Sequence, residues 1–202
     1  MKELKFFTAG IKYIEGLNEA DISFIPKLAL RRMSSLDKIT AAALKTCFCN
    51  ETDFILYASK TGEIERLNAL IEGYTLENEV SPAVFSDSVH NAPAGVFLIN
   101  EKKSIPYNSL AAGSDTFAAG LFASAAADRY SDILYVYSDI EDEKYVSMCL
   151  RIVKTGSIKY GIKLSSSKKA VFPRLKDYYA LFKGAVNAVQ TPDYKIERLE
   201  HA

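Results

Sequence analysis

Residues 109–128 read SLAAGSDTFAAGLFASAAAD. After a short strand or turn at the start of this stretch, alanine or another apolar residue falls on nearly every face of a helix. A helix that is apolar all round is packed on all sides by the rest of the protein. The uncharged run from Phe117 to Ala127 is closed by Asp128 and is far shorter than the roughly 20 residues of a membrane helix. The stretch therefore predicts a buried central helix around which the fold is built.

Strands and helices alternate on the N-terminal side of this helix. We expect strands at 4–14, 53–59 and 95–99, a helix after the serine cap at 34–35, a second helix over 61–74, and an irregular, proline-marked stretch over 79–95. Both helices carry apolar residues at helical spacing, namely Leu36, Ile39, Ala43 and Cys47 in the first and Ile64, Leu67, Ile71 and Tyr74 in the second. This periodicity is typical of a helix with one buried face.

On the C-terminal side, 132–140, 145–153 and 157–164 read as strands, and the short spacer at 154–156 predicts that the last two form a hairpin. A connection at 165–169 and a helix from Pro173 follow, and the final dozen residues read as a tail. The alternation predicts an α/β layered single domain, a mixed sheet with a buried central helix, in which helices lie between sheets.

Composition excludes several classes of function. The 25 basic and 25 acidic residues of the 202-residue chain cancel, which gives no electrostatic case for nucleic acid. The charged start of the chain does not resemble a signal peptide, so we expect a cytoplasmic protein without a membrane segment. The three cysteines, Cys47, Cys49 and Cys149, lack metal-ligand spacing and are expected to be free thiols. SKTGE at 59–63 does not match a phosphate-binding loop, and we expect neither a metal nor another cofactor.

Two segments carry a resemblance to a known family. FSDSVHNAPAGVFLI (85–99) and IPYNSLAAGSDTFAAGLFASAAA (105–127) resemble the N-terminal half of a β-ketoacyl-acyl carrier protein synthase, an enzyme of the thiolase fold. Asn91, Ala94 and Gly95 match the family's N-x-x-A-G pattern, and 109–112 match its S-x-A-C elbow. The SLAAG-x-DTFAAG run is similar to that of the chain length factor-like proteins of aryl-polyene biosynthesis. The resemblance covers roughly residues 1–153.

The resemblance implies a thiolase-like half domain over 1–165, with a C-terminal helix and tail at 166–202 packed on it. It also implies that the nucleophilic cysteine of the family is replaced by Ala112. The family's decarboxylating histidines come from a second half, which this chain does not contain; its histidines are His90 and His201. A methyl group supplies neither a nucleophile nor an acyl anchor, so the expected catalytic set is empty.

The leading hypothesis is therefore a non-catalytic, chain length factor type subunit that pairs with an active ketosynthase, or with itself, and receives an acyl carrier protein. The candidate acyl-tunnel or interface residues are Phe85, Val89, His90, Asn91, Ser114, Phe117, Leu121 and Phe122. The candidate carrier-protein contacts are Lys168, Lys169, Arg174 and Lys176, since opposite charge steers an acidic partner.

Other readings of the same residues stay open. Ser114, at what looks like a helix start, is expected to cap free N–H groups, but it is also the nucleophile candidate of an autonomous acyl enzyme. His90 is expected to be structural or interfacial, and it is the one residue placed to act as a general base. A third possibility is a freestanding protein that binds an acyl group or a carrier protein and that likewise has no nucleophile at its site. The basic run of 168–176 also reads as a solvated face around a helix start.

Overall fold

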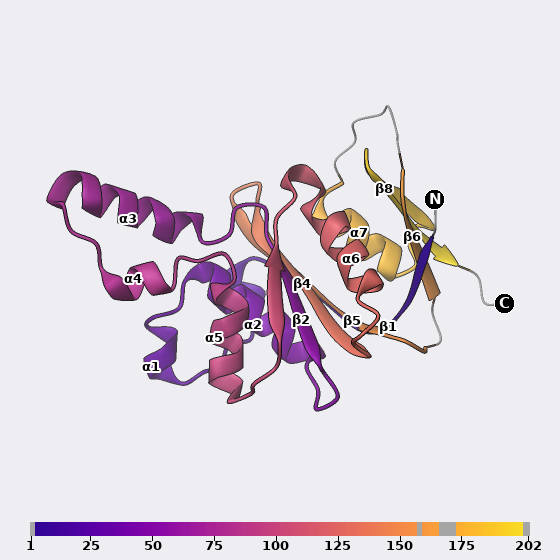
Figure 1. Cartoon of the computed structure of the whole chain (residues 1–202), viewed down its shortest axis with the longest axis horizontal. Helices are drawn as coiled ribbons and strands as arrows, with labels where there is room; N and C mark the ends of the chain where they lie inside the picture. The colour runs from indigo at the N-terminus through magenta and orange to yellow at the C-terminus, as the bar shows by residue number, and fades with distance from the viewer. Residues whose placement is uncertain (1–2, 157–158, 166–172, 200–202) are drawn as a thin grey trace.

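The computed structural model describes residues 3–156, 159–165 and 173–199. Its strands are β1 (Leu4–Glu15), β2 (Phe54–Ala58), β3 (Tyr107–Leu110), β4 (Asp132–Glu141), β5 (Lys144–Val153), β6 (Lys159–Leu164), β7 (Ala188–Gln190) and β8 (Tyr194–Leu199). Its helices are η1 (Leu17–Glu19), α1 (Lys27–Leu30), α2 (Ser35–Cys47), α3 (Ile64–Glu77), α4 (Pro82–Ser86), α5 (Ala92–Glu101), η2 (Gly113–Asp115), α6 (Thr116–Ala126) and α7 (Leu175–Phe182). Figure 1 shows their arrangement.

The strands form one mixed sheet in the order β3-β2-β4-β5-β1-β6-β8-β7. β2 pairs in parallel with β3 and β4, whereas every other pairing is antiparallel. All five residues of β2 are buried, as are the first eight of β4. Near-continuous apolar runs are typical of strands that are covered on both faces. The strands predicted at 53–59 and 132–140 and the α/β fold class are thus confirmed.

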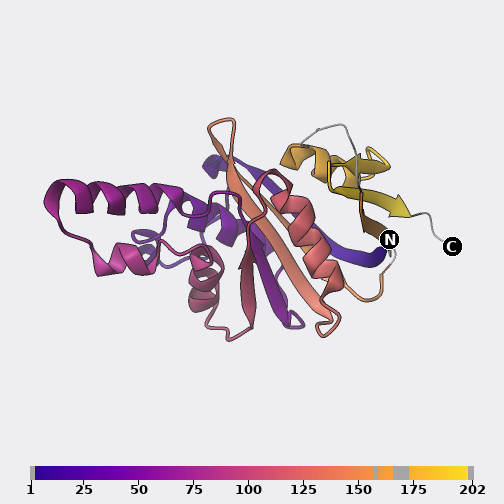
Figure 2. The same ribbon diagram turned by 45° about the horizontal axis from the view of Figure 1, so that its top comes forward.

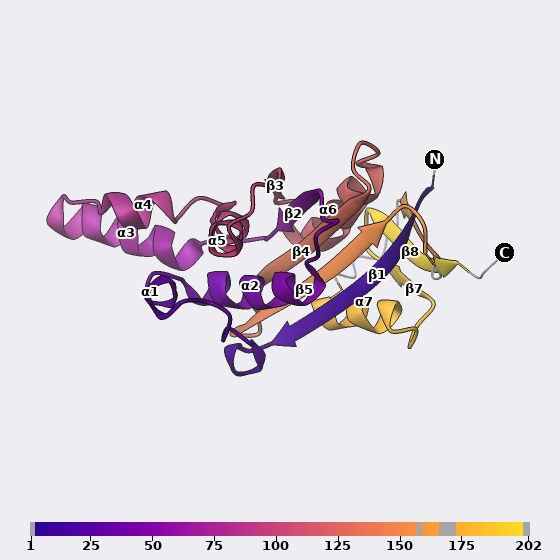
Figure 3. The same cartoon turned by 90° about the horizontal axis from the view of Figure 1, so that it is seen from below.

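Helices cover both faces of this sheet (Figure 3). α2 and α5 pack over one hydrophobic core, and α6 and α7 pack over the other. α6 contacts β1, β2 and β4 as well as β6 and β8 from the far end of the sheet. As predicted, α6 is buried along most of its length. The expectation that helices lie between two sheets is wrong, because the strands that contact α6 belong to both ends of one sheet.

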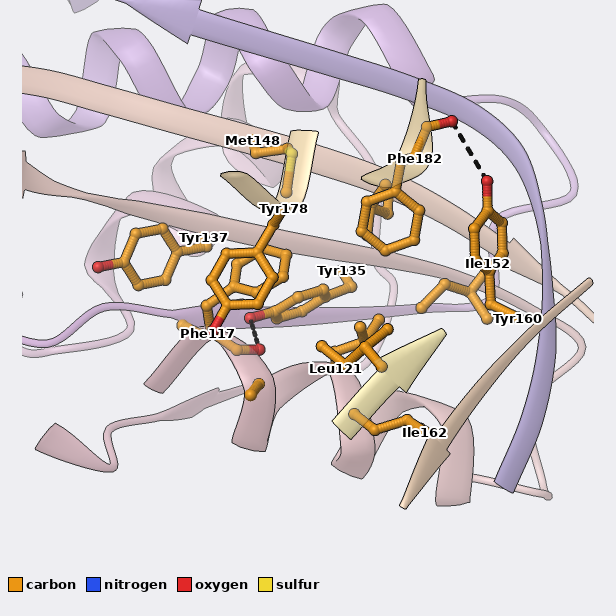
Figure 4. Packing of buried hydrophobic residues seen from close by; sticks show 14 of the residues in the cluster. Phe117, Leu121, Tyr135, Tyr137, Met148, Ile152, Tyr160, Ile162, Tyr178 and Phe182 are labelled. Carbon is orange, nitrogen blue, oxygen red and sulfur yellow. Dashed lines mark hydrogen bonds between the residues drawn. The ribbon is translucent and has the colours of Figure 1, made fainter. Parts of the chain in front are cut away.

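The core between α6 and α7 is rich in aromatic residues (Figure 4). The ring centroids of Phe117 and Tyr178 lie 4.2 Å apart, and Phe117 also packs against Tyr135 at 5.3 Å. The buried Tyr135 hydroxyl donates to the Phe117 carbonyl oxygen over 2.6 Å. α7 therefore packs against the start of α6 through the contact between Tyr178 and Phe117.

The strand predicted at 95–99 is wrong: this segment lies inside helix α5. A short apolar run fits a strand and a buried helix equally well. Tertiary packing decides here, because Ala94, Phe97 and Leu98 at helical spacing are buried against the α2 side while Ile99 points outward and is 77% exposed. Pro93 in the first turn suits a helix start, where the missing N–H is not needed.

The hairpin predicted for 145–164 is also wrong, because β1 lies between β5 and β6. β5 has β4 on one edge and β1 on the other, so neither edge is free for β6. The predicted C-terminal helix ends early, at Phe182, ahead of Gly184 with φ 78°. Residues 194–199 of the predicted tail form β8, which joins the sheet by pairing with β6.

Helices α3 and α4 project from the body as an arm, which we call the α3–α4 arm (residues 64–86; Figure 2). Leu70 is the single buried residue of α3, and α4 has none. The predicted helix over 61–74 is confirmed, but its apolar face is not covered. Ile71 and Tyr74 are 56% and 62% exposed.

Candidate functional site

The turn between β3 and α6 holds Ala112, the position to which the sequence resemblance assigns the family nucleophile. Ala112 is exposed, and Gly113 follows it with φ 55°, in the left-handed region that glycine adopts without strain. The Thr116 hydroxyl accepts from the Ala112 N–H over 2.9 Å and donates to the Gly113 carbonyl oxygen over 2.7 Å. One buried side chain therefore ties the turn into a closed ring, and the Ala112 amide is already bonded.

A cavity of about 260 Å³ opens beside this turn. It lies beyond the carboxyl ends of the parallel strands β2, β3 and β4, where ligands bind in open α/β sheets. Its polar lining includes Lys60, Ser114, Asp139, Glu141 and Tyr178. Burial raises the pKa of Glu141 above its ordinary value and keeps the Tyr178 phenol in its neutral form by raising its pKa. No histidine is among the described residues that line the cavity, so Ser114 has no imidazole base there.

Asp139 fixes the floor of this cavity. Its buried carboxylate accepts from the Lys60 N–H over 2.5 Å and from the Thr61 hydroxyl over 2.6 Å. The Tyr137 hydroxyl donates to it over 3.3 Å. Because these donors reach both oxygens, Asp139 joins the end of β4 to the turn that follows β2.

His90 is tied to the same turn from the other side. Its Nε2 lies 2.9 Å from the Ser59 carbonyl oxygen, which accepts, and its ring packs edge-on against Tyr57 at 5.6 Å. A Cβ at Gly62 would lie 2.9 Å from the ring. His90 is thus packed in a structural position, and it is not among the residues lining the cavity beside Ser114.

The structure separates the other predicted site residues. Phe117 lines the cavity, whereas Leu121 is buried in the core and Phe122 packs against Tyr194. Phe85 and Val89 are exposed on and just after the α3–α4 arm, and Asn91 caps α5. These eight residues therefore do not form one tunnel within this chain.

The two predicted carrier-protein contacts that the structure describes lie together at the start of α7. Arg174 lines the cavity and pairs with Asp142, and Arg174 and Lys176 both line a neighbouring groove. Lys168 and Lys169 lie outside the described residues. Arg174 is thus partly neutralised by an acidic neighbour.

A buried polar cluster at the root of the α3–α4 arm was not predicted from the sequence. Arg66 of α3 pairs with Asp37 of α2 over 2.9 Å and approaches Glu63 at 3.6 Å. It also donates to the main-chain oxygens of Arg32 and Asp87, over 2.6 and 2.8 Å. The carboxyl groups lie 29 residues or less from Arg66 in sequence but on different elements, so only the fold reveals that they meet.

A largely apolar groove was missed as well. This groove of about 440 Å³ lies between α1 and α5, with Leu28 and Ile99 exposed, and its charged lining residues are Arg32 and Asp87. Lys27 and Arg31 on and next to α1 are also exposed. The signal in the sequence is the run PKLALRR at 26–32, in which cations flank the apolar residues 28–30.

Cys47, Cys49 and Cys149 are free thiols, the first and last of them buried. Among the described residues there is no cluster of three or more side chains suited to a metal ion. None of the described helices has both the length and the apolar character that crossing a bilayer requires.

The family model for the β-ketoacyl synthase N-terminal domain matches residues 9–169. The chain belongs to the β-ketoacyl synthase family. Its fold is similar to a chain of the structure "Ketosynthase (ApeO) in Complex with its Chain Length Factor (ApeC) from Xenorhabdus doucetiae", with a TM-score of 0.80, 19% identity, and coverage of 96% of this chain and 100% of that one. It is also similar to the ishigamide ketosynthase/chain length factor, with a TM-score of 0.62, 10% identity, and coverage of 91% and 74%. The comparison with curated proteins gave no match.

These comparisons confirm the resemblance seen in the sequence and the thiolase-like half fold. At such low identities the two solved structures establish the fold that this β-ketoacyl synthase family member shares with ketosynthase/chain length factor proteins. The functions of the chains in those complexes are properties of those proteins.

Proposed function

We propose that this chain is a non-catalytic subunit of the chain length factor type, which pairs with an active ketosynthase in the biosynthesis of an aryl polyene or a similar polyketide. The partner performs the condensation. This chain supplies part of the wall of the partner's acyl tunnel and so limits the length of the product.

The nucleophile turn carries the proposal. Condensation needs a thiolate and backbone N–H groups that are free to bind a developing oxyanion. At this turn the side chain is the methyl group of Ala112, and the Ala112 amide is bonded to Thr116. Both requirements are unmet at the same residue, while the surrounding β3–α6 scaffold is intact. A β3–α6 turn that has the scaffold of the family but not its nucleophile favours a role in assembly over a role in catalysis.

The α3–α4 arm supports a protein partner. Leu67, Ile71 and Tyr74 form an exposed apolar stripe at helical spacing, and Phe85 is 60% exposed on α4. Isolated helices of this length are marginal in water, so an apolar stripe on a projecting helix is stabilised by contact with another surface. The predicted wall residues Phe85 and Val89 lie on and beside this arm and would reach the partner.

The edge of the sheet offers a second contact on the same side of the molecule. β3 is a terminal strand with β2 as its one neighbour, and Tyr107 on it is 39% exposed. An open edge presents unpaired N–H and C=O groups, which pair readily with a strand of another chain. We infer that the partner covers both the arm and this edge.

The apolar groove between α1 and α5, with the cations of 27–32, suits the acyl carrier protein. Arg32 lines the groove together with Asp87, and Lys27 and Arg31 are exposed on and next to α1, whereas the predicted contact Arg174 is paired with Asp142. An acidic partner is steered by unpaired cations and held by apolar contact. We therefore place the carrier-protein contact at this groove in preference to the C-terminal run.

Co-expression with a ketosynthase that has an intact S-x-A-C turn and is encoded beside this chain tests the proposal. Size-exclusion chromatography should show a complex of the two chains. Ile71→Glu, which puts a charge into the apolar stripe, should weaken the complex by tenfold or more. Val186→Glu is the matched control, since Val186 is 41% exposed but lies beyond α7, away from the arm. A chain that stays alone at every concentration would refute the proposed function.

A further inference from the structure

The polar cluster at the root of the α3–α4 arm contains more acid than base. The side chains of Asp37 and Glu63 are 0% and 1% exposed, and that of Arg66 is 13% exposed. Two buried carboxyl groups thus share one guanidinium. Asp37 Oδ1 has no hydrogen-bond partner among the described residues, although it is fully buried. Two carboxylates that share a site do not both ionise readily, because each disfavours the charge of the other.

This cluster is also what attaches the arm to the body. The Ser34 hydroxyl donates to Glu63 over 2.8 Å, and Arg66 links α3 to Asp37 of α2. Tyr145 of β5 donates a hydrogen bond to Glu65, the residue directly before Arg66. Since Leu70 is the one buried side chain of α3, apolar packing contributes little to holding the arm. The orientation of the arm therefore depends on polar contacts at residues 63–66.

We propose that Asp37, Glu63 and Arg66 form a protonation-sensitive hinge for the α3–α4 arm. With one proton between the two carboxyl groups, Glu63 donates to Asp37, and the remaining carboxylate balances Arg66. When that proton is lost, two buried carboxylates face one cation, and the root of the arm loosens as Glu63 turns toward water. The arm is held at low pH and released at higher pH.

The charged surroundings fit this assignment. Burial, followed by the charge of Asp37, raises the pKa of Glu63 from its ordinary 4.5 to about 7, whereas Arg66 acts in the opposite direction. The titratable and charged groups that face the pair are Asp37 on α2, Glu65 and Arg66 on α3, Asp87 before α5, Tyr57 on β2 and Tyr145 on β5. Arg66 is the one cation among them.

The direction of the pH effect follows from linkage. Glu63 has a higher pKa in the folded arm than in an open one, so the closed arm binds the proton more tightly. The stabilisation is complete below about pH 4.5 and is lost as pH rises through about 7. Between these two values the opening equilibrium should rise by up to about tenfold for each pH unit, and above about pH 7 it should level off, because Glu63 is then ionised in both states.

Amide hydrogen exchange of the isolated chain tests the hinge. Protection factors of the 64–77 amides, corrected for the intrinsic pH dependence of exchange, are measured between about pH 4.5 and 8.5. In the wild type we expect them to fall by up to about tenfold per unit as pH rises toward about 7 and to level off above it, while those of β4 and β5 stay constant. A loss spread equally over the sheet would overturn the proposal, because it would mean global and not hinge opening.

Two variants and one direct titration complete the test. Glu63→Gln keeps the neutral form at every pH, so its protection factors should stay flat. Glu72→Gln, at an exposed position further along α3 and away from the cluster, should follow the wild type. The carboxyl carbon of Glu63 in the ¹³C NMR spectrum of the wild type should titrate near pH 7. A midpoint near 4.5, or a Glu63→Gln variant that follows the wild type, would overturn the hinge.

The consequence for assembly rests on the proposed function. If the arm binds the ketosynthase, the affinity of the complex should fall as pH rises from about 4.5 to about 7 and then level off, and Glu63→Gln should remove this fall. Absence of any complex at every pH in this range would refute the proposed function and leave the exchange result standing. A complex whose affinity does not change over this range would refute the link between the hinge and the partner.

Discussion

Replacing Gly120 with alanine tests how closely α6 packs on the sheet. A Cβ at this position would lie 2.6 Å from Tyr135 Cε2, 2.8 Å from its hydroxyl oxygen and 2.9 Å from Cζ. Carbon atoms in contact normally lie about 3.5–4.0 Å apart, so α6 or the ring has to move by about 1 Å. Tyr135 is fully buried and held by its 2.6 Å hydrogen bond to the Phe117 carbonyl oxygen (Figure 4).

Opposing effects set the size of the change. Alanine is a better helix former than glycine by about 1 kcal/mol, which alone predicts a more stable protein. Overpacking in a core costs about 1–3 kcal/mol, and breaking the Tyr135 hydrogen bond while it is buried adds about 1–3 kcal/mol. Packing prevails, and we expect Gly120→Ala to lower the free energy of unfolding by about 2 kcal/mol.

Urea unfolding followed by circular dichroism measures this difference. The control is the same substitution in a Tyr135→Leu background, where the ring is gone. There Gly120→Ala should be neutral or stabilising by up to about 1 kcal/mol, because the helix propensity acts alone. If Gly120→Ala alone leaves the protein as stable as the wild type, the close approach of α6 to β4 is not as described.

Three further substitutions test the nucleophile turn and its surroundings. Thr116→Val removes the hydroxyl that bonds the Ala112 amide and the Gly113 carbonyl, and should cost about 1–2 kcal/mol in urea unfolding, whereas Thr116→Ser should cost clearly less. Asp139→Asn places an amide N–H against donors that now meet a carboxylate oxygen, and should lower the free energy of unfolding by about 2 kcal/mol; an unchanged midpoint would show that the Asp139 contacts carry little energy. Ala112→Cys restores a thiol but not a free amide, so the isolated chain should still form no condensation product from acyl and malonyl thioesters, and turnover would contradict the proposed role of the partner.

The candidate site was predicted in one respect and missed in another. Ala112 could be found from the sequence, because the S-x-A-C turn of the family is a local pattern with fixed spacing. The clamp at Asp139 and the cluster at Arg66 could not, since their partners come from separate strands and helices. Neither has a sequence motif, and only tertiary packing brings the groups within hydrogen-bond distance.

The helix at 92–101 shows where local pattern fails. GVFLI has the content of a strand, and its helical state follows from packing against α2, which is not visible in a short apolar run. The place of β6 fails for a related reason. Neighbouring strands often form hairpins, but both edges of β5 are already taken by β4 and β1. The pairing of β5 with β1 joins residues that are far apart in the sequence, so a local pattern does not reveal it.

The stretch 109–128 determined by itself that the protein has a buried central helix and that alanine stands at position 112 in the turn before it, because apolar content on every face and the identity of residue 112 are properties of the local sequence. The tertiary structure decided what surrounds that helix. It packed α7 and the C-terminal strands against α6 and bonded the Ala112 N–H to the Thr116 hydroxyl. It also left the α3–α4 arm exposed. Local sequence sets which faces are apolar, whereas the competition of all such faces for burial decides which of them the chain covers by itself.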